Sequence, residues 1–182
     1  RDYHYEIYVM NADGSGDPIN VTRNPALDSY PSWSPDGRWL AFVSDRSGNW
    51  DIWKMDIAAC LMAIAHNEDI ETSCQAIQLT DNLDDDVYPA WSPDGTRIAF
   101  ESRREANRDI YIMDADGGNL TRVTTEFWHD STPIWALGGR AIIYSSLRQG
   151  DWDLYMIDVD GSNERRLTST EGEDRFGDWY GP

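Results

Sequence analysis

Four aspartates recur along the chain at matching places and are well placed for polar chemistry. They are Asp28, Asp86, Asp130 and Asp174, and each stands five residues before a tryptophan. A carboxylate can cap free backbone N–H groups where a chain enters a strand. It can also attract a cation or a basic partner. Because the four recur, capping is the simpler interpretation, and binding stays open as the alternative.

A second recurring set combines aromatic rings with arginine. Tyr5, Trp50, Arg108 and Trp152 hold equivalent positions, each just before an apolar stretch, and Trp128 and His129 stand together in another segment. Such side chains are enriched at protein-binding surfaces. We therefore predict a binding role for both sets, with the alternative that the rings only fill space between neighbouring units. The candidate binding residues are Tyr5, Trp50, Arg108, Trp152, Trp128, His129, Asp28, Asp86, Asp130 and Asp174.

Motifs for catalysis are missing from the sequence. It contains no Gly-x-Ser-x-Gly elbow, no His-Glu-x-x-His and no glycine-rich phosphate loop with lysine. His4, His66 and His129 fall in unrelated segments, so no histidine metal site is expected. The segment from Asn11 to Asp17 is similar to a calcium loop but lacks the closing glutamate. We expect no catalytic residue, no metal and no cofactor, with calcium as a weak alternative at this segment.

Composition narrows the classes of partner. Of 182 residues 33 are acidic and 15 are basic, which gives a net charge of −18 and argues against nucleic acid or anionic lipid as partners. Nine tryptophans and nine tyrosines indicate a folded core and not an acidic disordered chain. The longest apolar run, Ile57 to Ala65, is too short to span a bilayer.

An internal repeat indicates which structural units position these residues. Trp33, Trp91, Trp135 and Trp179 are separated by 58, 44 and 44 residues, and Thr22, Thr80, Thr124 and Thr168 keep the same intervals. The longer first interval coincides with an insertion at residues 58–76. Within it, the apolar stretch 59–65 is interpreted either as a short helix covering blade edges or as a docking patch.

Each unit contains four short β-rich stretches, named A to D. Strand A ends at the repeat tryptophan, strands B and C are apolar almost throughout, and strand D ends at the repeat threonine. Apolar strands without alternation are typical of sheets buried on both faces. Four antiparallel strands in about 44 residues fit one blade of a β-propeller. The fold class is therefore all-β, with helix expected only in the insertion.

The motifs also resemble a known family. Pro-x-Trp-Ser-Pro-Asp-Gly, a B strand followed by arginine, and Asp-Ile-Tyr-x-Met-Asp-Ala-Asp-Gly before apolar-Thr are similar to the repeat of the TolB-like (WD-repeat-like) β-propellers. The third unit departs from it, with Ala136 to Gly139 in place of Ser-Pro-Asp-Gly, and its turn is expected to be looser. The resemblance implies a propeller but not one function, because scaffolds, peptidase propeller domains and sugar-degrading enzymes share the repeat.

We predict one propeller domain over residues 1–182. The units are 1–22 (partial), 28–80 with the insertion, 86–124, 130–168 and 174–182 (partial). The strand phase permits a small four-bladed ring that lacks one B strand, or part of a larger propeller, which the resemblance suggests has six blades. The unpaired edge left by a missing strand favours the larger propeller.

Propeller topology gathers the candidate residues on one face. The D-to-A and B-to-C loops share one end of the blades, and the A-to-B and C-to-D turns share the other. The D-to-A stretches carry ten acidic residues and one basic residue, Arg175. We also expect an ion pair in each B-to-C loop, such as Arg46 with Asp51 or Arg104 with Asp109.

Both cysteines, Cys60 and Cys74, lie in the insertion. Two cysteines are too few for a typical structural zinc site, so a disulfide is predicted, and with it an extracytoplasmic location: periplasmic, secreted or cell-surface. The leading functional hypothesis is a non-enzymatic module that binds a protein partner, and the acidic charge favours a basic one. The alternatives are the propeller of a prolyl-oligopeptidase-like hydrolase, a sugar lyase, or a carbohydrate-binding module that uses Trp50, Trp128 and Trp152.

Overall fold

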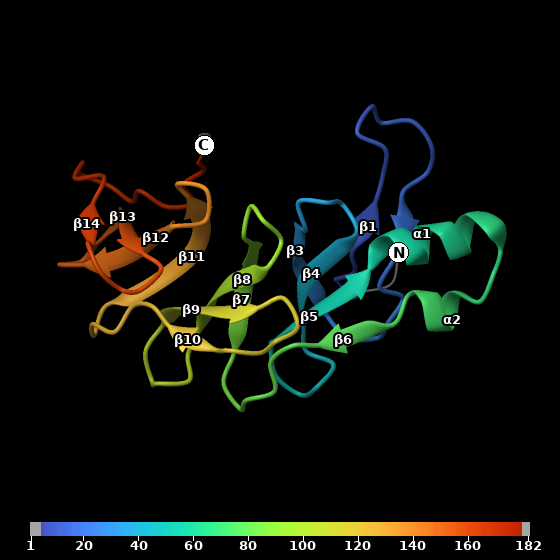
Figure 1. Cartoon of the computed structure of the whole chain (residues 1–182), viewed down its shortest axis with the longest axis horizontal. Helices are drawn as coiled ribbons and strands as arrows, with labels where there is room; N and C mark the ends of the chain where they lie inside the picture. Colours follow the sequence, from blue (N-terminus) through green and yellow to red (C-terminus); the bar gives the residue numbers. More distant parts are fainter. Residues whose placement is uncertain (1–4, 180–182) are drawn as a thin grey trace.

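The computed structural model describes residues 5–179, which form a row of antiparallel sheets along a gentle arc (Figure 1). Three sheets have four strands each, in the spatial order in which they occur along the chain or its reverse, and a fourth sheet has two. This is the blade architecture that the repeat predicts. Arg1 and His4 lie outside the described residues.

The strands follow the predicted A-to-D order in the three complete units, and the first, partial unit supplies strands C and D. The two-stranded sheet consists of β1 (Tyr8–Val9) and β2 (Ile19–Asn20). The first four-stranded blade consists of β3 (Asp28–Trp33), β4 (Trp39–Ser44), β5 (Asp51–Asp56) and β6 (Ala76–Gln78). The second consists of β7 (Asp86–Trp91), β8 (Arg97–Ser102), β9 (Asp109–Asp114) and β10 (Thr121–Arg122). The third consists of β11 (His129–Ala136), β12 (Ala141–Arg148), β13 (Asp151–Asp158) and β14 (Arg165–Arg166).

The repeat threonine, predicted as the last residue of strand D, lies two residues after that strand in each unit and has a defined structural role there. Its Oγ1 accepts a hydrogen bond from the backbone N–H of an apolar residue in or next to strand C in each unit: 3.1 Å for Thr22 and 2.9 Å for each of the others. A short D strand makes few ladder bonds, and the side chain supplies one more. This explains why threonine recurs there.

The repeat tryptophan packs against the preceding blade. Trp91 of the second blade belongs to a cluster with Val43 and Ile52 of the first, and Trp135 of the third packs on the second and donates its indole N–H to the Ala90 carbonyl at 2.9 Å. Both are buried, whereas Trp33 is 47% exposed. The sheet before Trp33 has only two strands and covers less of its ring.

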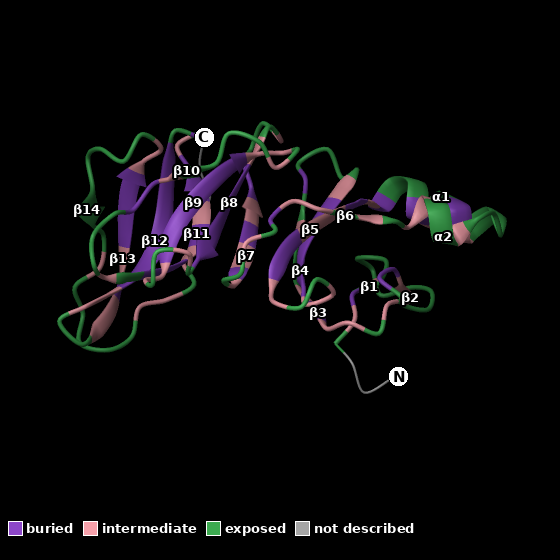
Figure 2. Ribbon diagram, turned by 90° about the horizontal axis from the view of Figure 1, so that it is seen from below, coloured by how far each residue is buried: buried purple, intermediate pink, exposed green. Residues whose placement is uncertain are grey.

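The core lies between the blades. Figure 2 shows the buried residues concentrated along the central strands of each sheet, with loops and outer strands exposed. Strands β4, β8 and β12 are buried over nearly their whole length, as apolar strands packed on both faces must be. The blades therefore hold the loops at their ends in fixed relative positions.

The final A strand is a correction to the sequence prediction. Residues 174–179 form no strand, and Trp179 therefore does not lie on an innermost strand. The backbone N–H of Asp174 still donates to the Trp152 carbonyl at 2.7 Å, so the chain enters this segment as it enters the other blades. Within residues 5–179 there is no B strand beside it, and without a partner the ladder does not form.

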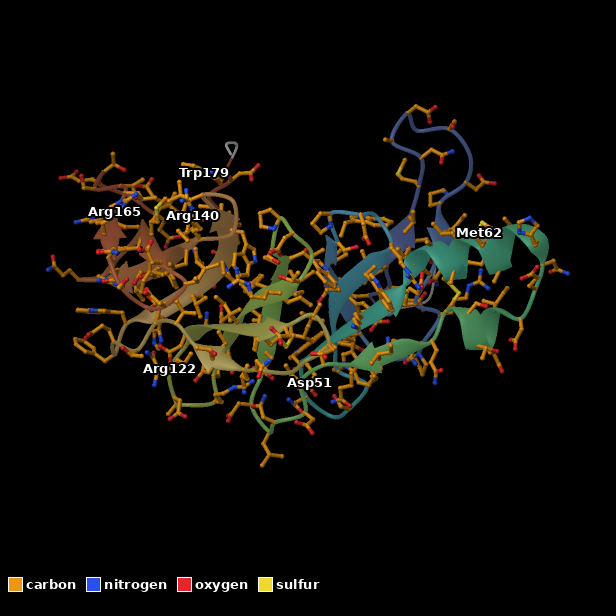
Figure 3. The ribbon with its side chains drawn as sticks, in the orientation of Figure 1. Asp51, Met62, Arg122, Arg140, Arg165 and Trp179 are labelled. Atoms are coloured by element: carbon orange, nitrogen blue, oxygen red, sulfur yellow. A yellow bond between two sulfur atoms is a disulfide. The ribbon has the colours of Figure 1, made fainter. Side chains whose placement is uncertain are left out.

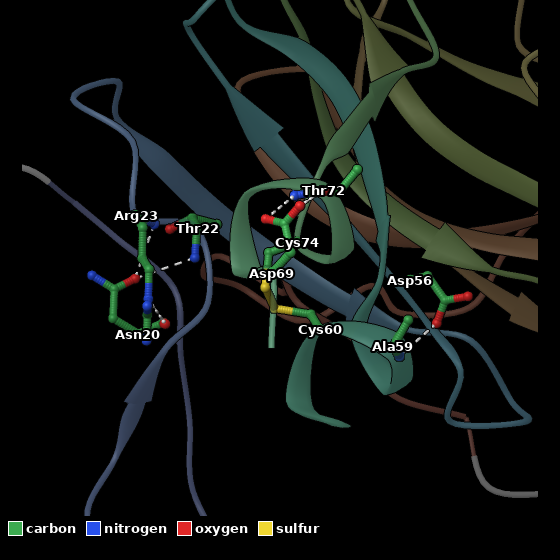
Figure 4. The surroundings of a disulfide bond; sticks show 9 residues. All are labelled: Asn20, Thr22, Arg23, Asp56, Ala59, Cys60, Asp69, Thr72 and Cys74. Atoms are coloured by element: carbon green, nitrogen blue, oxygen red, sulfur yellow. Dashed lines mark hydrogen bonds between the residues drawn. A yellow bond between two sulfur atoms is a disulfide. The ribbon is translucent and has the colours of Figure 1, made fainter. Parts of the chain in front are cut away.

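Helices among the described residues occur only in the insertion, as expected. Helix α1 (Ile57–His66) starts at the cap Asp56, which accepts from the N–H of Ala59, and α2 (Ile70–Ser73) starts at Asp69. Cys60 and Cys74 are joined by a disulfide (Figure 4). Ile57 and Cys60 are buried in one cluster with Ile7 and Val21 of the two-stranded unit. Helix α1 therefore covers the edge between the first two units, the first of the two interpretations above.

Two opposite ends of the blades carry different loops. In Figure 3, Asp51 and Arg122 lie in the lower half, where strand C begins and strand D ends, whereas Arg140, in an A-to-B turn, and Met62 of α1 lie in the upper half. The lower end, with the D-to-A and B-to-C loops, is called the loop face below. The upper end is called the turn face.

Candidate functional site

The four recurring aspartates connect neighbouring units through their backbone. The N–H groups of Asp28, Asp86, Asp130 and Asp174 donate to the carbonyls of Tyr5, Trp50, Arg108 and Trp152, respectively, at 2.7–2.8 Å. The two sets singled out from the sequence are therefore paired, one residue from each. This pairing fixes the aromatic and arginine set at the loop face.

Burial removes three of the aspartates from the surface. Asp28, Asp86 and Asp130 are at most 2% exposed. The Asp28 carboxylate pairs with Arg46 and that of Asp86 with Arg104, both at 2.8 Å. The capping interpretation is therefore wrong in its partner: among the described residues these carboxylates accept from side chains and not from backbone N–H groups. Their role remains structural, and their burial leaves no surface for partner contact. Asp174, half-buried, accepts from the Thr170 hydroxyl.

The ion pairs predicted within the B-to-C loops are wrong. Arg46 and Arg104 pair with the strand A aspartates instead, and each guanidinium also lies over an aromatic ring of strand C, Trp53 or Tyr111. Asp109 pairs with Arg122 of strand D at 2.9 Å. Sequence spacing put the groups in the right loop but did not fix the side-chain directions.

The third blade breaks this pattern. Arg148, the equivalent of Arg46 and Arg104, pairs with Glu164 through two nitrogen atoms, at 2.7 and 3.0 Å, and Glu164 also accepts from the Tyr144 hydroxyl. Asp130 keeps only the Ser146 hydroxyl, at 2.6 Å, as a side-chain partner among the described residues. Burial without a paired cation raises the pKa of the Asp130 carboxyl to about 7.

A cavity of about 560 Å³ opens on the loop face between the first two four-stranded blades and the segment before β1. Tyr5, Trp50 and Arg108, three of the equivalent residues, line it together. The structure thus brings half of the six predicted ring and arginine residues to one place. Its volume is within the range of small-molecule pockets.

The remaining three candidates lie elsewhere. Trp152 is covered by the Arg175 guanidinium, 4.0 Å from its ring, and Trp128 packs against Phe127 with ring centres 4.2 Å apart. His129 is exposed at the start of β11. None of the three lines the cavity.

Two tyrosines that sequence reasoning missed complete the aromatic wall. Tyr30 and Tyr88 hold equivalent positions at a bulge in strand A, with φ of 50° and 56°, and their ring centres lie 4.4 Å apart. Left-handed backbone at an aromatic residue is uncommon and turns its side chain out of the normal pleat. Burial, with a further contribution from Tyr30, raises the pKa of Tyr88 to about 12.

Glu101 is the other residue that was missed. It lies on β8, lines the cavity and is fully buried, and burial raises the pKa of its carboxyl. Its equivalents in the other blades are Val43 and Ser145. A signal was present in the sequence, because Glu101 is the one acidic residue inside a run that is otherwise apolar or small in every unit.

Metal ligands do not gather in the part of the chain that the structure describes. Residues 5–179 contain no cluster of three or more His, Cys, Asp or Glu side chains able to hold an ion. At the calcium-like segment, Asp13 accepts from the Ser15 N–H and Asn11 donates to Ser15, as in an ordinary turn. In the same residues no helix has the length and apolarity needed to cross a membrane.

The fold and site define a propeller-type domain with its D-to-A and B-to-C loops and a cavity on the same face. The TolB beta propeller domain matches the chain over residues 66–180, and the chain belongs to that family. The match covers more than half of the sequence, and the repeat is continuous with the residues before it.

Relatives extend well beyond this chain. It is 29% identical over 140 residues to an uncharacterized protein of Agrobacterium fabrum, covering 72% of this chain and 43% of that protein. It is 36% identical over 122 residues to the Tol-Pal system protein TolB of Anaeromyxobacter dehalogenans, covering 67% and 24% of the two chains. The chain therefore spans less than half the length of these relatives.

Solved structures agree on the fold. The crystal structure of TolB from Acinetobacter baumannii superposes with a TM-score of 0.74 at 23% identity, over 92% of this chain and 38% of that one. An oligogalacturonate lyase from Vibrio parahaemolyticus superposes with a TM-score of 0.60 at 15% identity, over 88% and 45%. At such identities the likeness shows the fold alone.

Proposed function

We propose that the chain is a non-enzymatic, extracytoplasmic interaction module that binds a protein partner on its loop face. The observation that carries the proposal is the cavity in which Tyr5, Trp50 and Arg108 meet Tyr30 and Tyr88. Large rigid rings contribute contact area at a small loss of conformational entropy, and arginine adds directed hydrogen bonds. Relatives named as components of a Tol-Pal system support a role in assembly.

The acidic charge of the chain should raise the rate at which the partner associates. The chain carries a net charge of −18, and Asp81, Asp84 and Glu126 are exposed in the D-to-A loops. A field of one sign raises the association rate of a partner of opposite charge. We therefore infer that the partner is basic at its contact surface.

The disulfide supports the proposed location outside the cytoplasm. Cys60 and Cys74 are bonded and Cys60 is fully buried. Structural disulfides persist in oxidising compartments and are rare in the cytosol. This supports a periplasmic, secreted or cell-surface protein.

Kinetics with a co-purified partner test the proposal. Trp50→Ala should raise the dissociation rate by about tenfold or more, as at an interface anchor. Trp33→Ala is the matched control, since Trp33 is half-exposed at the far end of β3 and lies outside the cavity. A faster dissociation rate only in Trp33→Ala, or an equal increase in both variants, would contradict binding on the loop face.

A further inference from the structure

The cavity on the loop face contains one ion pair, Glu101 with Arg108, that has no direct hydrogen bond. Its charged lining residues are Asp85, Arg103, Glu101 and Arg108. Asp85 and Arg103 pair with each other at 3.2 Å. Glu101 and Arg108 come no closer than 3.6 Å, which is too long for a direct hydrogen bond.

One carboxylate oxygen of Glu101 accepts a hydrogen bond, and the other, Oε1, lies 3.6 Å from Arg108 Nε without one. Oε2 accepts from the Ser131 hydroxyl, while Oε1 is buried without a hydrogen-bond partner among residues 5–179. A buried, unpaired carboxylate oxygen costs free energy that a donor from a ligand would recover. An N–H or O–H group of a ligand in the cavity would therefore satisfy Oε1.

Arg108 has the opposite requirement. Its guanidinium has five N–H donors, its side chain is 35% exposed, and Glu101 is the one carboxylate within 4 Å of it in the described chain. Arginine binds a carboxylate through two parallel hydrogen bonds. Arg175 adds a further positive charge near Glu101 while its guanidinium covers Trp152. This environment disfavours a purely cationic ligand.

We propose that the cavity binds a small zwitterion of the α-amino acid class, with its ammonium group on Glu101 and its carboxylate on Arg108. The two protein groups lie 3.6 Å apart, so a ligand that carries both charges on one carbon can reach both. The rings of Trp50, Tyr30 and Tyr88 then enclose an apolar or aromatic side chain. The lining carries two acidic and two basic residues, which suits a ligand with no net charge.

This ligand is distinct from the protein partner of the proposed function, and neither requires the other. The cavity is lined mainly by residues of the first two four-stranded blades, whereas the charged loops around it extend over the whole loop face. A bound zwitterion would occupy the floor of the site that the partner covers.

Calorimetry with chosen probes tests the assignment. Phenylalanine and leucine should bind, whereas phenethylamine, 3-phenylpropionate and N-acetylphenylalanine, each lacking one charge, should bind at least about tenfold more weakly, since each loses a charged hydrogen bond. Binding of phenethylamine as tight as that of phenylalanine would overturn the role of Arg108. Binding of a neutral disaccharide alone would overturn the ligand class.

Two variants with matched controls locate the site. Glu101→Gln and Arg108→Met should each reduce affinity for the amino acid by about tenfold or more. Two control variants should leave the affinity unchanged. They are Glu105→Gln, at an exposed acid in the B-to-C loop that carries Arg108, and Arg140→Met on the turn face. Far-ultraviolet circular dichroism and thermal unfolding establish that each variant is folded. Unchanged affinity in a folded Glu101→Gln protein, or no binding of any amino acid to the parent chain, would refute the proposal.

Discussion

The Arg148 guanidinium lies 2.7 Å from a carboxylate oxygen of Glu164 and not on Asp130, although the equivalent arginines of the other two blades pair with the equivalent aspartates. One acidic side chain in the third blade thus diverts an arginine from its usual partner. The result is a buried carboxyl, Asp130, whose pKa is raised to about 7.

Replacing Glu164 tests this competition. In Glu164→Gln the Arg148 side chain loses its charged partner and becomes free to approach Asp130, as Arg104 approaches Asp86. The pKa of Asp130 should then fall below its parent value of about 7. Carbon-detected titration of the carboxyl groups measures it. A pKa that stays unchanged would show that Arg148 does not reach Asp130 even when released.

Stability should depend on pH through the same carboxyl. An unfolded aspartate titrates near pH 4, so between about pH 4 and pH 7 the folded state holds a proton that the unfolded state has lost. The stability associated with the protonated carboxyl is present below pH 4 and is lost as pH rises toward 7, by at most about 1.4 kcal/mol per pH unit.

Asp130→Asn should remove that slope, because the amide does not titrate. Urea unfolding at pH 5, 6, 7 and 8 measures it, with the exposed Asp84→Asn as control. Parallel slopes for the parent and Asp130→Asn proteins would contradict the assignment.

The buried ion pair in the second blade should matter far more than its exposed neighbour. Arg104→Ala leaves the fully buried Asp86 carboxyl without its paired cation and should cost about 3–5 kcal/mol. Arg103→Ala breaks a pair in which both side chains are about one-third or more exposed and should cost under about 1 kcal/mol. Equilibrium unfolding of the two variants decides it, and equal losses would contradict the structural role given to the strand A aspartates.

The disulfide should stabilise the insertion against unfolding. Cys60 and Cys74 are 14 residues apart, and a loop of that size is worth about 3 kcal/mol in the chain-entropy model. Replacing both by serine should lower the free energy of unfolding by up to that amount. Thiol counting on denatured, unreduced protein should give no free thiol, and two free thiols in natively isolated protein would also remove the argument for location.

Much of the fold was predictable from the sequence because a propeller repeats. The interval between Trp91 and Trp135 equals that between Thr80 and Thr124. Such matched intervals predict the order of the strands, the position of the insertion and the face on which each loop lies, although no long-range contact is known. The unpaired segment at residues 174–179 was not predictable, since the residue pattern is that of a strand and only the missing neighbour prevents the ladder.

The site was predictable in part, for a related reason. Tyr5, Trp50 and Arg108 are identified by their equivalent positions in the repeat, and the propeller topology brings them to one face. Tyr30 and Tyr88 were missed because a bulge re-aims them, and Glu101 because a buried acid within strand B depends on its surroundings in space. Pairing of Arg46 with Asp28 depends on side-chain direction, which spacing does not specify.

Site-specific photo-crosslinking in the native host tests the central claim, partner binding on the loop face, most directly. A photoreactive residue in place of Tyr5, which is 73% exposed at the cavity, is compared with one in place of Met62, which is 61% exposed on α1. We predict a cross-linked partner from position 5, in an amount that decreases as salt rises, and none from position 62. A salt-insensitive partner cross-linked from position 62 and not from position 5 would contradict it.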